Sequence, residues 1–216
     1  YDDVGSWQVS RRFFRRMTDA GIELYPFLPV YFPVLTSKVN YRNHRKLIVI
    51  DGVTAYIGGM NIALRYANKW RDTHMLVRGG VVNAIHRAFL VDWYFVSQTL
   101  ITGRKYYPEP KVKVSNNCIA QIVTSSPVTP DPEMMQGYVR IIVEARRYVY
   151  METPYFLPTE SIMFALRTAA IAGVDVQLMV PFKSDAKVVE WASRSYLLQA
   201  IDAGVKVFAY KREFNH

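Results

Sequence analysis

The second half of the chain alternates short apolar runs with longer segments in which apolar residues recur at helical spacing. Short apolar runs bounded by turn residues indicate buried strands, and the longer amphipathic segments indicate helices. Thr159 is suited to cap one of these helices and Gly173 to end it. The predicted strands cover residues 148–152, 174–180 and 205–210, and the predicted helices cover residues 133–145, 159–172 and 186–203. This alternation predicts an α/β protein with mixed sheets flanked by helices.

The first half has a less regular pattern, and a hairpin is its clearest feature. Two apolar runs, residues 47–50 and 54–57, flank the pair Asp51-Gly52, which favours tight hairpin turns. Helical spacing of apolar residues predicts a long helix over residues 81–101. The remaining predictions for this half are a helix over residues 6–19, a strand over residues 22–28, a short helix from residue 61 and a strand over residues 74–77. A further strand, over residues 119–123, is predicted to open the second half.

An internal repeat divides the chain into two halves. The sequence Asp-Ala-Gly-Ile-Glu-Leu at residues 19–24 recurs as Asp-Ala-Gly-Val-Lys-Val at residues 202–207, and each copy leads through apolar residues to an Asn-His pair ending at His44 or His216. The alternative is a chance recurrence of a helix stop before a strand, since glycine commonly follows helices. The matching order of elements favours the repeat. We therefore predict a first half, a basic proline-containing linker and a second half: residues 1–102, 103–117 and 118–216.

The side chains that most clearly indicate a chemistry lie in and around the predicted hairpin of residues 47–57. Their spacing is His44-x-Lys46-x4-Asp51-x6-Gly58-Gly59-x-Asn61. A histidine and a lysine two positions apart on an extended segment point to the same face. An imidazole beside a fixed ammonium suits attack on a phosphodiester, because the ammonium offsets charge on the phosphoryl oxygens. The glycines let backbone come close, and Asn61 offers an amide donor.

Three acidic side chains each have two interpretations. Asp51 precedes a glycine, so it is a turn residue, a member of the motif, or both. Asp72 either fixes the tautomer of a catalytic imidazole through a hydrogen bond or forms an ion pair with a base such as Arg71. Glu152 ends a predicted strand, where it either shapes a substrate pocket or caps local backbone.

Composition adds a preference for anionic partners. The chain has 27 Lys and Arg against 18 Asp and Glu, a formal net charge of +9. This balance favours phospholipid headgroups or nucleic acid, although a solvated basic surface gives the same count. Cys118 is the single cysteine, which excludes a disulfide within the chain. No apolar run reaches the ~20 residues that span a bilayer, and no residue cluster indicates a metal site.

The motif resembles the HKD motif of the phospholipase D superfamily. Across most of the chain, further segments resemble the bacterial cardiolipin synthases of that superfamily rather than its nucleases. These segments are Tyr41-Arg-Asn-His-Arg-Lys46, Tyr56-Ile-Gly-Gly-Met-Asn61, Trp70-Arg-Asp-Thr-His74, Asp92-Trp-Tyr-Phe95, Glu152-Thr-Pro-Tyr-Phe156, residues 170–181 and Ala192-Ser-Arg-Ser-Tyr196. The resemblance implies a phospholipase D-like architecture, with two pseudo-symmetric halves around one site. It also implies that this chain is a fragment whose second half is truncated at its motif histidine, His216.

The same resemblance implies a phosphatidyltransferase without a cofactor. It would make cardiolipin from two phosphatidylglycerol molecules and release glycerol. His44 would form a phosphatidyl-histidine intermediate, and His216 would act first as general acid and then as general base. The implied catalytic set is His44, Lys46, Asp51, Asn61, Asp72 and His216, and the implied substrate-binding set is Gly58, Gly59 and Glu152.

The implied location is the bacterial cell membrane, with membrane-spanning N-terminal segments presumed to lie outside this chain. A membrane surface and anionic phospholipid would be its partners, and no nucleic acid is expected. Apolar residues at 25–35 and 93–95 are candidates for lipid contact, with core packing as the alternative. Two other functions stay open: a phospholipase D-type hydrolase or nuclease, and a non-enzymatic module that binds anionic membranes. The isolated chain is expected to be nearly inactive, because losing one member of a catalytic set removes most activity.

Overall fold

In the computed structural model, residues 1–29, 42–109, 118–126 and 133–216 are described. They pack into two compact units. The first unit contains Tyr1–Gly58 and Met75–Ile122, and the second contains Gly59–His74 and Val123–His216. The segment that follows the hairpin, Gly59–His74, therefore packs with the second unit. These packing units differ from the halves predicted from the repeat, residues 1–102 and 118–216. The predicted boundaries describe a sequence repeat rather than packing, and they stay a prediction.

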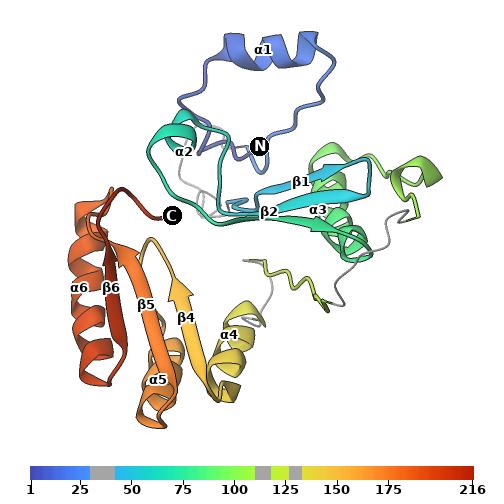
Figure 1. The fold of residues 1–216 in the computed structure, drawn as a ribbon. Coiled ribbons are helices and arrows are strands. Elements are labelled where there is room, and N and C mark those ends of the chain that lie inside the picture. Colours follow the sequence, from blue (N-terminus) through green and yellow to red (C-terminus); the bar gives the residue numbers. More distant parts are fainter. Residues whose placement is uncertain (30–41, 110–117, 127–132) are drawn as a thin grey trace. The chain divides into compact units, whose positions relative to one another are not determined.

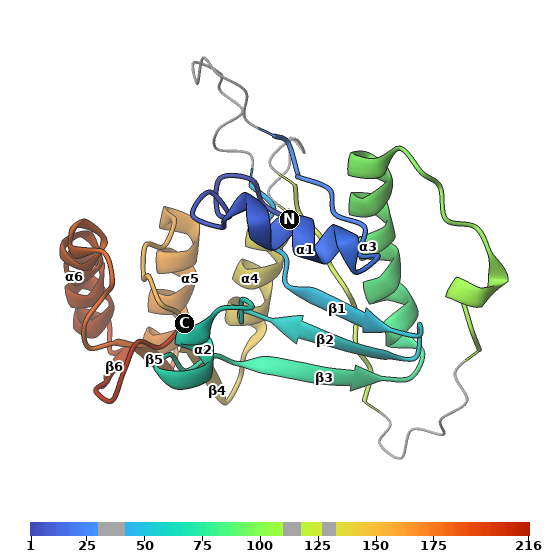
Figure 2. The ribbon, with the colours of Figure 1, turned by 90° about the horizontal axis from the view of Figure 1, so that it is seen from above.

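The first unit is built on a three-stranded sheet in the order β1-β2-β3 (Figure 2). β1 (Leu47–Ile50) and β2 (Thr54–Gly58) pair antiparallel, which confirms the predicted hairpin. β3 (His74–Arg78) completes the sheet and confirms the predicted strand. In the turn between β1 and β2, Asp51 and Gly52 have φ values of 52° and 68°. Few residues other than Gly, Asn and Asp tolerate this left-handed region, which explains the pair.

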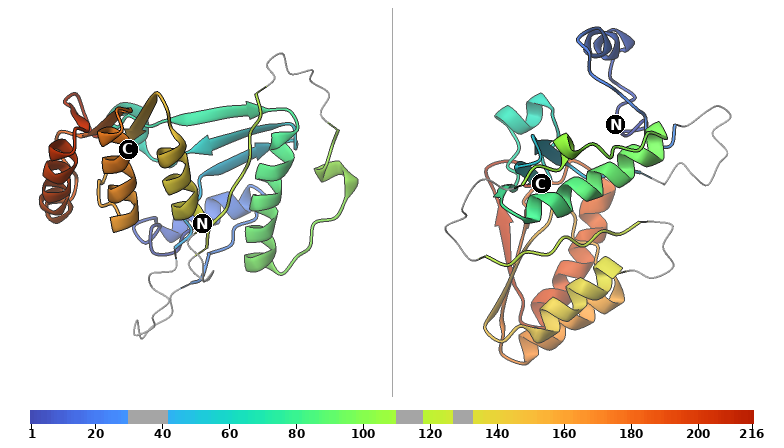
Figure 3. Two further views of the ribbon diagram at one scale, coloured as in Figure 1. Left: turned by 90° about the horizontal axis from the view of Figure 1, so that it is seen from below. Right: turned by 90° about the vertical axis from the view of Figure 1, so that its right-hand side faces the viewer.

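α3 (Val81–Ser97) packs against β1 and β2 (Figure 3). Val82 and Ile85 from the helix and Ala55 from β2 are fully buried and form the small core of the first unit. The helix ends before the predicted residue 101, because Gln98 adopts a left-handed conformation and its N–H donates to Tyr94 O at 2.9 Å.

Two of the predicted strands are wrong. Residues 22–28 form only an isolated parallel bridge between Asp2 and Phe27, and residues 118–126 run without regular secondary structure. An apolar run becomes a strand only where a neighbouring strand can pair with it.

Two of the predicted helices begin later than expected. α1 (Arg11–Asp19) starts after Ser10, whose hydroxyl accepts a hydrogen bond from Phe13 N–H, so the helix begins at residue 11 rather than at residue 6. α2 (Leu64–Asn68) replaces the short helix expected from residue 61. Local capping by Ser10 decides where α1 begins, whereas α2 follows Ala63 without a side-chain cap.

The second unit is built on a parallel sheet in the order β4-β5-β6 (Figure 1). Its strands are β4 (Tyr148–Glu152), β5 (Asp175–Pro181) and β6 (Lys206–Tyr210). α5 (Glu160–Ile171) and α6 (Lys187–Asp202) connect the strands and pack on the sheet, and α4 (Glu133–Glu144) packs beside α5. These elements confirm the strands and helices predicted between residues 133 and 210, and they confirm the α/β class. Thr159 caps α5, as predicted, by accepting a hydrogen bond from Ile162 N–H.

The core of the second unit lies between its sheet and these helices. Val176, Leu178 and Val180 alternate along β5 and are buried, whereas the residues between them are partly exposed. They pack with Leu166 and Ala169 from α5. This core fixes the ends of the strands, which matters for the site at the end of β4.

His86 predicts a pH dependence for the first unit. Burial in α3 lowers the pKa of His86 below its ordinary value of 6.5, despite a hydrogen bond with the backbone of Tyr106. As pH falls, His86 takes up a proton in the unfolded chain more readily than in the folded chain. The contribution of His86 to the free energy of unfolding is therefore fully present above pH 6.5 and declines below it. We expect calorimetric unfolding of the first unit to occur at lower temperature at about pH 5.5 than at about pH 7.5. His86→Gln should reduce that difference, and an equal difference in both proteins would contradict the assignment.

Candidate active site

The last three residues of the chain lie along the segment that precedes β3, beside α2 (Figure 2). Arg71 N–H donates to Phe214 O at 3.0 Å, and His216 N–H donates to Arg71 O at 2.9 Å. Arg71 and Asn215 thus form a parallel bridge, and the Asn215 side chain is fully buried. This backbone register brings together two residues that are 144 positions apart, Asp72 and His216.

Asp72 and His216 form a close hydrogen-bonded pair. His216 Nδ1 lies 2.6 Å from Asp72 Oδ2, and the exposed fractions of the two side chains are 15% and 5%, respectively. An ionised carboxylate only accepts hydrogen bonds, so Nδ1 carries the shared proton and Nε2 is the nitrogen that remains for proton transfer. The geometry matches the tautomer-fixing interpretation of Asp72, because the Arg71 guanidinium pairs with Glu152 instead.

The absence of a side chain at Gly59 leaves room for the Asp72–His216 pair. A Cβ on Gly59 would lie 2.8 Å from both carboxylate oxygens of Asp72 and 3.0 Å from His216 Nδ1. Gly59 N–H also donates to Thr73 O at 3.4 Å, which holds the backbone near Asp72. The sequence predicted close approach at the glycines, and at Gly59 the group that approaches is the Asp72–His216 pair. Gly58 is the last residue of β2, and its role in substrate binding stays a prediction.

Aromatic rings surround the His216 imidazole. The Trp70 ring lies nearly parallel to it, at 23° and 5.9 Å between centroids. Tyr66 approaches edge-on at 5.5 Å, and Phe214 lies at 6.3 Å. The Arg65 guanidinium carbon lies 4.7 Å from the centre of the Trp70 ring on the same segment. These rings shield the imidazole from water and fix its plane.

Two tyrosines near this imidazole are held in their protonated form. Asn61 Nδ2 donates to Tyr66 Oη at 2.8 Å, and burial raises the pKa of Tyr66, an effect that this hydrogen bond partly offsets. Tyr155 Oη donates to Asp185 Oδ1 at 2.6 Å. Burial first, and this hydrogen bond second, raise the pKa of Tyr155 far above its ordinary value. Both phenols are therefore hydrogen-bonding groups rather than bases at neutral pH.

Glu152 lies at the end of β4 and contacts the segment that carries Asp72. It forms an ion pair with Arg71, and its Oε2 accepts a hydrogen bond from Thr73 Oγ1 at 3.5 Å. Arg71 Nη1 also lies 3.4 Å from Asn215 Oδ1. The Glu152 carboxylate thus contacts Arg71 and Thr73. A role of Glu152 in substrate binding stays a prediction.

His44 and Lys46 lie in the first unit, just before β1. Lys46 Nζ donates to His44 O at 2.8 Å, the His44 side chain is exposed, and Lys46 is half-buried. Asn43 and Arg45 instead turn to Asp92 on α3, with distances of 3.1 Å and 2.5 Å to its carboxylate oxygens. Alternate residues of an extended segment face opposite sides, so His44 and Lys46 share the side away from Asp92.

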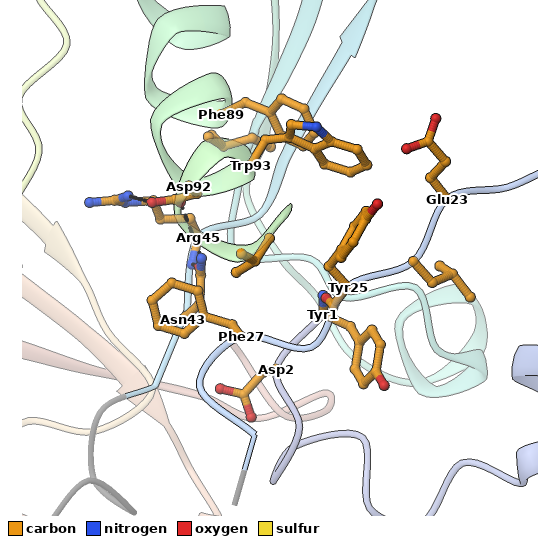
Figure 4. Close-up of a pocket in the computed structure, with 13 residues that line it drawn as sticks. Tyr1, Asp2, Glu23, Tyr25, Phe27, Asn43, Arg45, Phe89, Asp92 and Trp93 are labelled. Carbon is orange, nitrogen blue, oxygen red and sulfur yellow. Dashed lines mark hydrogen bonds and ion pairs between the residues drawn. The ribbon is translucent and has the colours of Figure 1, made fainter. Parts of the chain in front are cut away.

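A cavity of about 350 Å³ in the first unit lies on the Asp92 side of this segment (Figure 4). Tyr25 and Trp93 meet edge to face in its wall, with 5.0 Å between ring centroids. Phe27 packs against Phe95 at 5.4 Å. Tyr25, Phe27 and Trp93 thus contact other aromatic rings, whereas Tyr94 and Phe95 are about half exposed. Lipid contact by these residues stays a prediction. Residues 30–35 of the predicted lipid-contact segment lie outside the described residues.

Asp51 lies at the hairpin turn, beyond the far end of β1. It follows His44 by seven positions, and extended chain rises about 3.3 Å per residue, so the two residues are on the order of 20 Å apart. This separation fits the turn interpretation. A catalytic role for Asp51 stays a prediction.

Within the described ranges, no group of three or more His, Cys, Asp or Glu side chains is placed to hold a metal ion. A search of the same residues finds no helix with the length and apolar character needed to cross a bilayer. The predicted lack of a metal and of a cofactor stays a prediction.

Several residues of this site received no role from the sequence. They are Arg65, Tyr66, Trp70, Arg71 and Asn215. Asn215 had an available signal, since it precedes His216 as Asn43 precedes His44. Trp70 and Arg71 belong to a segment that resembles the cardiolipin synthases, and Arg65 and Tyr66 had only their place between the glycine pair and β3 as a signal.

Known proteins resemble this chain in sequence and in fold. The family described as "Cardiolipin synthase, PLD-like domain" matches residues 138–216. The chain is 40% identical to "Cardiolipin synthase 2" of Bacillus cereus, 39% identical to "Cardiolipin synthase" of Geobacillus thermodenitrificans and 38% identical to a "Probable cardiolipin synthase" of Bacillus subtilis. Each match covers 100% of this chain and 43–44% of the relative. The polyphosphate kinase of Porphyromonas gingivalis shares the fold, with a TM-score of 0.51 and 16% identity over 95% of this chain and 30% of that one.

These matches, the α/β fold and the His-Lys motif show that the chain belongs to the phospholipase D superfamily. Within this superfamily it is homologous, over its whole length, to the bacterial cardiolipin synthases. The chain spans somewhat less than half the length of these relatives. The predicted resemblance is thereby confirmed.

Proposed function

We propose that the complete protein is a phosphatidyltransferase that joins two phosphatidylglycerol molecules into cardiolipin and releases glycerol. Homology to cardiolipin synthases along the whole chain supports this choice of lipid. The Asp72–His216 hydrogen bond is the observation that best supports the proposed chemistry, because it fixes the tautomer of an imidazole that can transfer protons. The net charge of +9 suits an anionic membrane surface as the place of reaction.

The proposed reaction has two displacements at one phosphorus. His44 attacks the phosphorus of the first phosphatidylglycerol, the phosphorus–oxygen bond to glycerol breaks, and a phosphatidyl-histidine forms. Protonated His216 gives the proton on Nε2 to the departing glycerol oxygen. A hydroxyl group of the second phosphatidylglycerol then returns a proton to Nε2 as its oxygen attacks phosphorus. The phosphorus–nitrogen bond breaks, cardiolipin leaves, and both histidines are restored.

Other residues of the motif support this reaction. Lys46 supplies positive charge for the phosphoryl oxygens, and Asn61 supplies an amide donor. Asp72 keeps the His216 ring in one orientation throughout both proton transfers. The aromatic residues around His216 restrict the access of water, which favours an alcohol as acceptor over hydrolysis.

Product analysis tests the proposal. The full-length enzyme is incubated with vesicles that contain headgroup-labelled phosphatidylglycerol, and the lipids are identified by mass spectrometry. We expect cardiolipin and free glycerol in equal amounts, and we expect His44→Ala to lower the rate by about 10³-fold or more because the nucleophile is lost. His86→Gln, which changes a histidine inside α3, is the control and should keep the wild-type rate at neutral pH.

Other products would overturn the proposal in different ways. Phosphatidic acid without cardiolipin would identify a phospholipase D-type hydrolase. No lipid product at all, together with cleavage of a nucleic acid, would identify a nuclease.

A further inference from the structure

The residues on either side of Asp72 both contact Glu152. Successive side chains of an extended segment point to opposite sides, so Arg71 and Thr73 share the side opposite Asp72. Arg71 forms an ion pair with Glu152, and Thr73 Oγ1 donates to the other carboxylate oxygen at 3.5 Å. Asp72 faces His216 on the other side, at 2.6 Å. One carboxylate therefore holds both neighbours of the residue that orients the imidazole.

Glu152 is itself fixed by the sheet of the second unit. It is the last residue of β4 and pairs with Met179 in β5. The next residue, Thr153, donates its N–H to Met179 O at 3.2 Å. A side chain at the end of a hydrogen-bonded strand is a more rigid support than one on a loop. The ion pair thus attaches the irregular segment before β3 to the parallel sheet.

The same guanidinium also reaches the chain that carries the imidazole. Arg71 Nη1 lies 3.4 Å from Oδ1 of Asn215, and the Asn215 side chain is fully buried next to His216. The backbones of Arg71 and Asn215 form the parallel bridge described above. Arg71 is therefore linked to Glu152, to Asp72 and to the segment of His216.

We propose that Glu152 is a positioning residue, which acts through Arg71 to set the geometry of the Asp72–His216 hydrogen bond. The Glu152 and Arg71 side chains are 26% and 40% exposed, and ion pairs at that exposure contribute little to folding stability. The consequence lies in the rate, because a misplacement of about 1 Å at a reacting group costs up to about 10²-fold. This kinetic consequence rests on the proposed function, whereas the structural consequence does not.

Kinetics of Glu152→Gln in the full-length enzyme test the proposal. With phosphatidylglycerol in mixed vesicles, we expect kcat to fall by about 10- to 100-fold while KM stays within about 2-fold. Arg71→Gln should give a similar loss. The double variant should lose no more than either single variant, because both changes break one link. Glu144→Gln is the matched control, since Glu144 forms an exposed ion pair with Arg140 on α4, and it should leave kcat and KM unchanged.

Hydrogen–deuterium exchange gives a readout that does not depend on the reaction. In Glu152→Gln, we expect faster exchange in peptides that contain the amides of Arg71 and His216, which bridge the two segments. Exchange in peptides from β4 and β5 should stay unchanged. This measurement remains decisive if the wild-type enzyme makes no cardiolipin, so failure of the proposed function and failure of the positioning role are distinguishable.

Two results would overturn the positioning role. A higher KM at unchanged kcat in Glu152→Gln would make Glu152 a substrate-binding residue. Unchanged exchange at the amides of Arg71 and His216 would show that Glu152 does not hold these segments together, whatever the change in rate.

Discussion

Replacing Asp72 with Asn is expected to lower kcat for phosphatidyl transfer by about 10³- to 10⁴-fold, the loss seen when a catalytic imidazole loses its orienting carboxylate. The Asp72 carboxylate accepts a hydrogen bond from His216 Nδ1 at 2.6 Å. An amide of the same size can instead donate a hydrogen bond to Nδ1, which moves the ring proton to Nε2 and favours the wrong tautomer. KM should change little, because the carboxylate orients the imidazole rather than the lipid. Steady-state kinetics of the full-length enzyme measure both quantities.

The matched control for this change is Asp175→Asn. Asp175 is also a paired carboxylate, with Lys206 Nζ at 2.7 Å, but it lies at the start of β5. Its replacement should leave kcat within about 2-fold of wild type, because the loss of an exposed ion pair has a small effect. If Asp72→Asn kept a tenth or more of the wild-type kcat, the orienting role of Asp72 would be wrong.

Replacing Gly59 with Ala is expected to lower kcat by about 10²-fold, as a misplaced catalytic group does. The new methyl group would lie 2.8 Å from both Asp72 oxygens and 3.0 Å from His216 Nδ1. Those atoms must move, and the Asp72–His216 hydrogen bond must lengthen or break. Forced overpacking also costs about 1–3 kcal/mol of folding free energy. Activity assays and thermal unfolding of the full-length enzyme test both effects.

Gly137→Ala is the control for the change at Gly59. Gly137 is an exposed residue of α4, and a Cβ there meets no atom within 4 Å. This substitution should leave kcat unchanged and raise the free energy of unfolding by about 0.5–1 kcal/mol, because alanine favours the helix over glycine. Full activity and unchanged stability in Gly59→Ala would mean that the pair tolerates the extra methyl group, contrary to the expected clash at 2.8 Å.

The regular part of the fold could be predicted because its signals are local. The alternation of apolar runs and amphipathic segments located β4, β5, β6 and the helices between them. Asp51-Gly52 predicted the hairpin, since few residues tolerate the positive φ values of that turn. The strands predicted at residues 22–28 and 119–123 failed for a nonlocal reason. Among the residues that the structure describes, no strand pairs with these apolar runs along their length.

For the site, the sequence by itself determined which chemistry is available. It supplied the histidines, the lysine, Asp72 and the glycines at spacings that indicate attack on a phosphodiester. Only the tertiary structure decided that Asp72 pairs with His216, that Gly59 makes room for this pair, and that Glu152 contacts the neighbours of Asp72. The physical reason is that these contacts join residues far apart in the chain, through the backbone register of Arg71 with Asn215. That register depends on how the segment before β3 packs against the sheet of the second unit, which no local pattern of residues encodes.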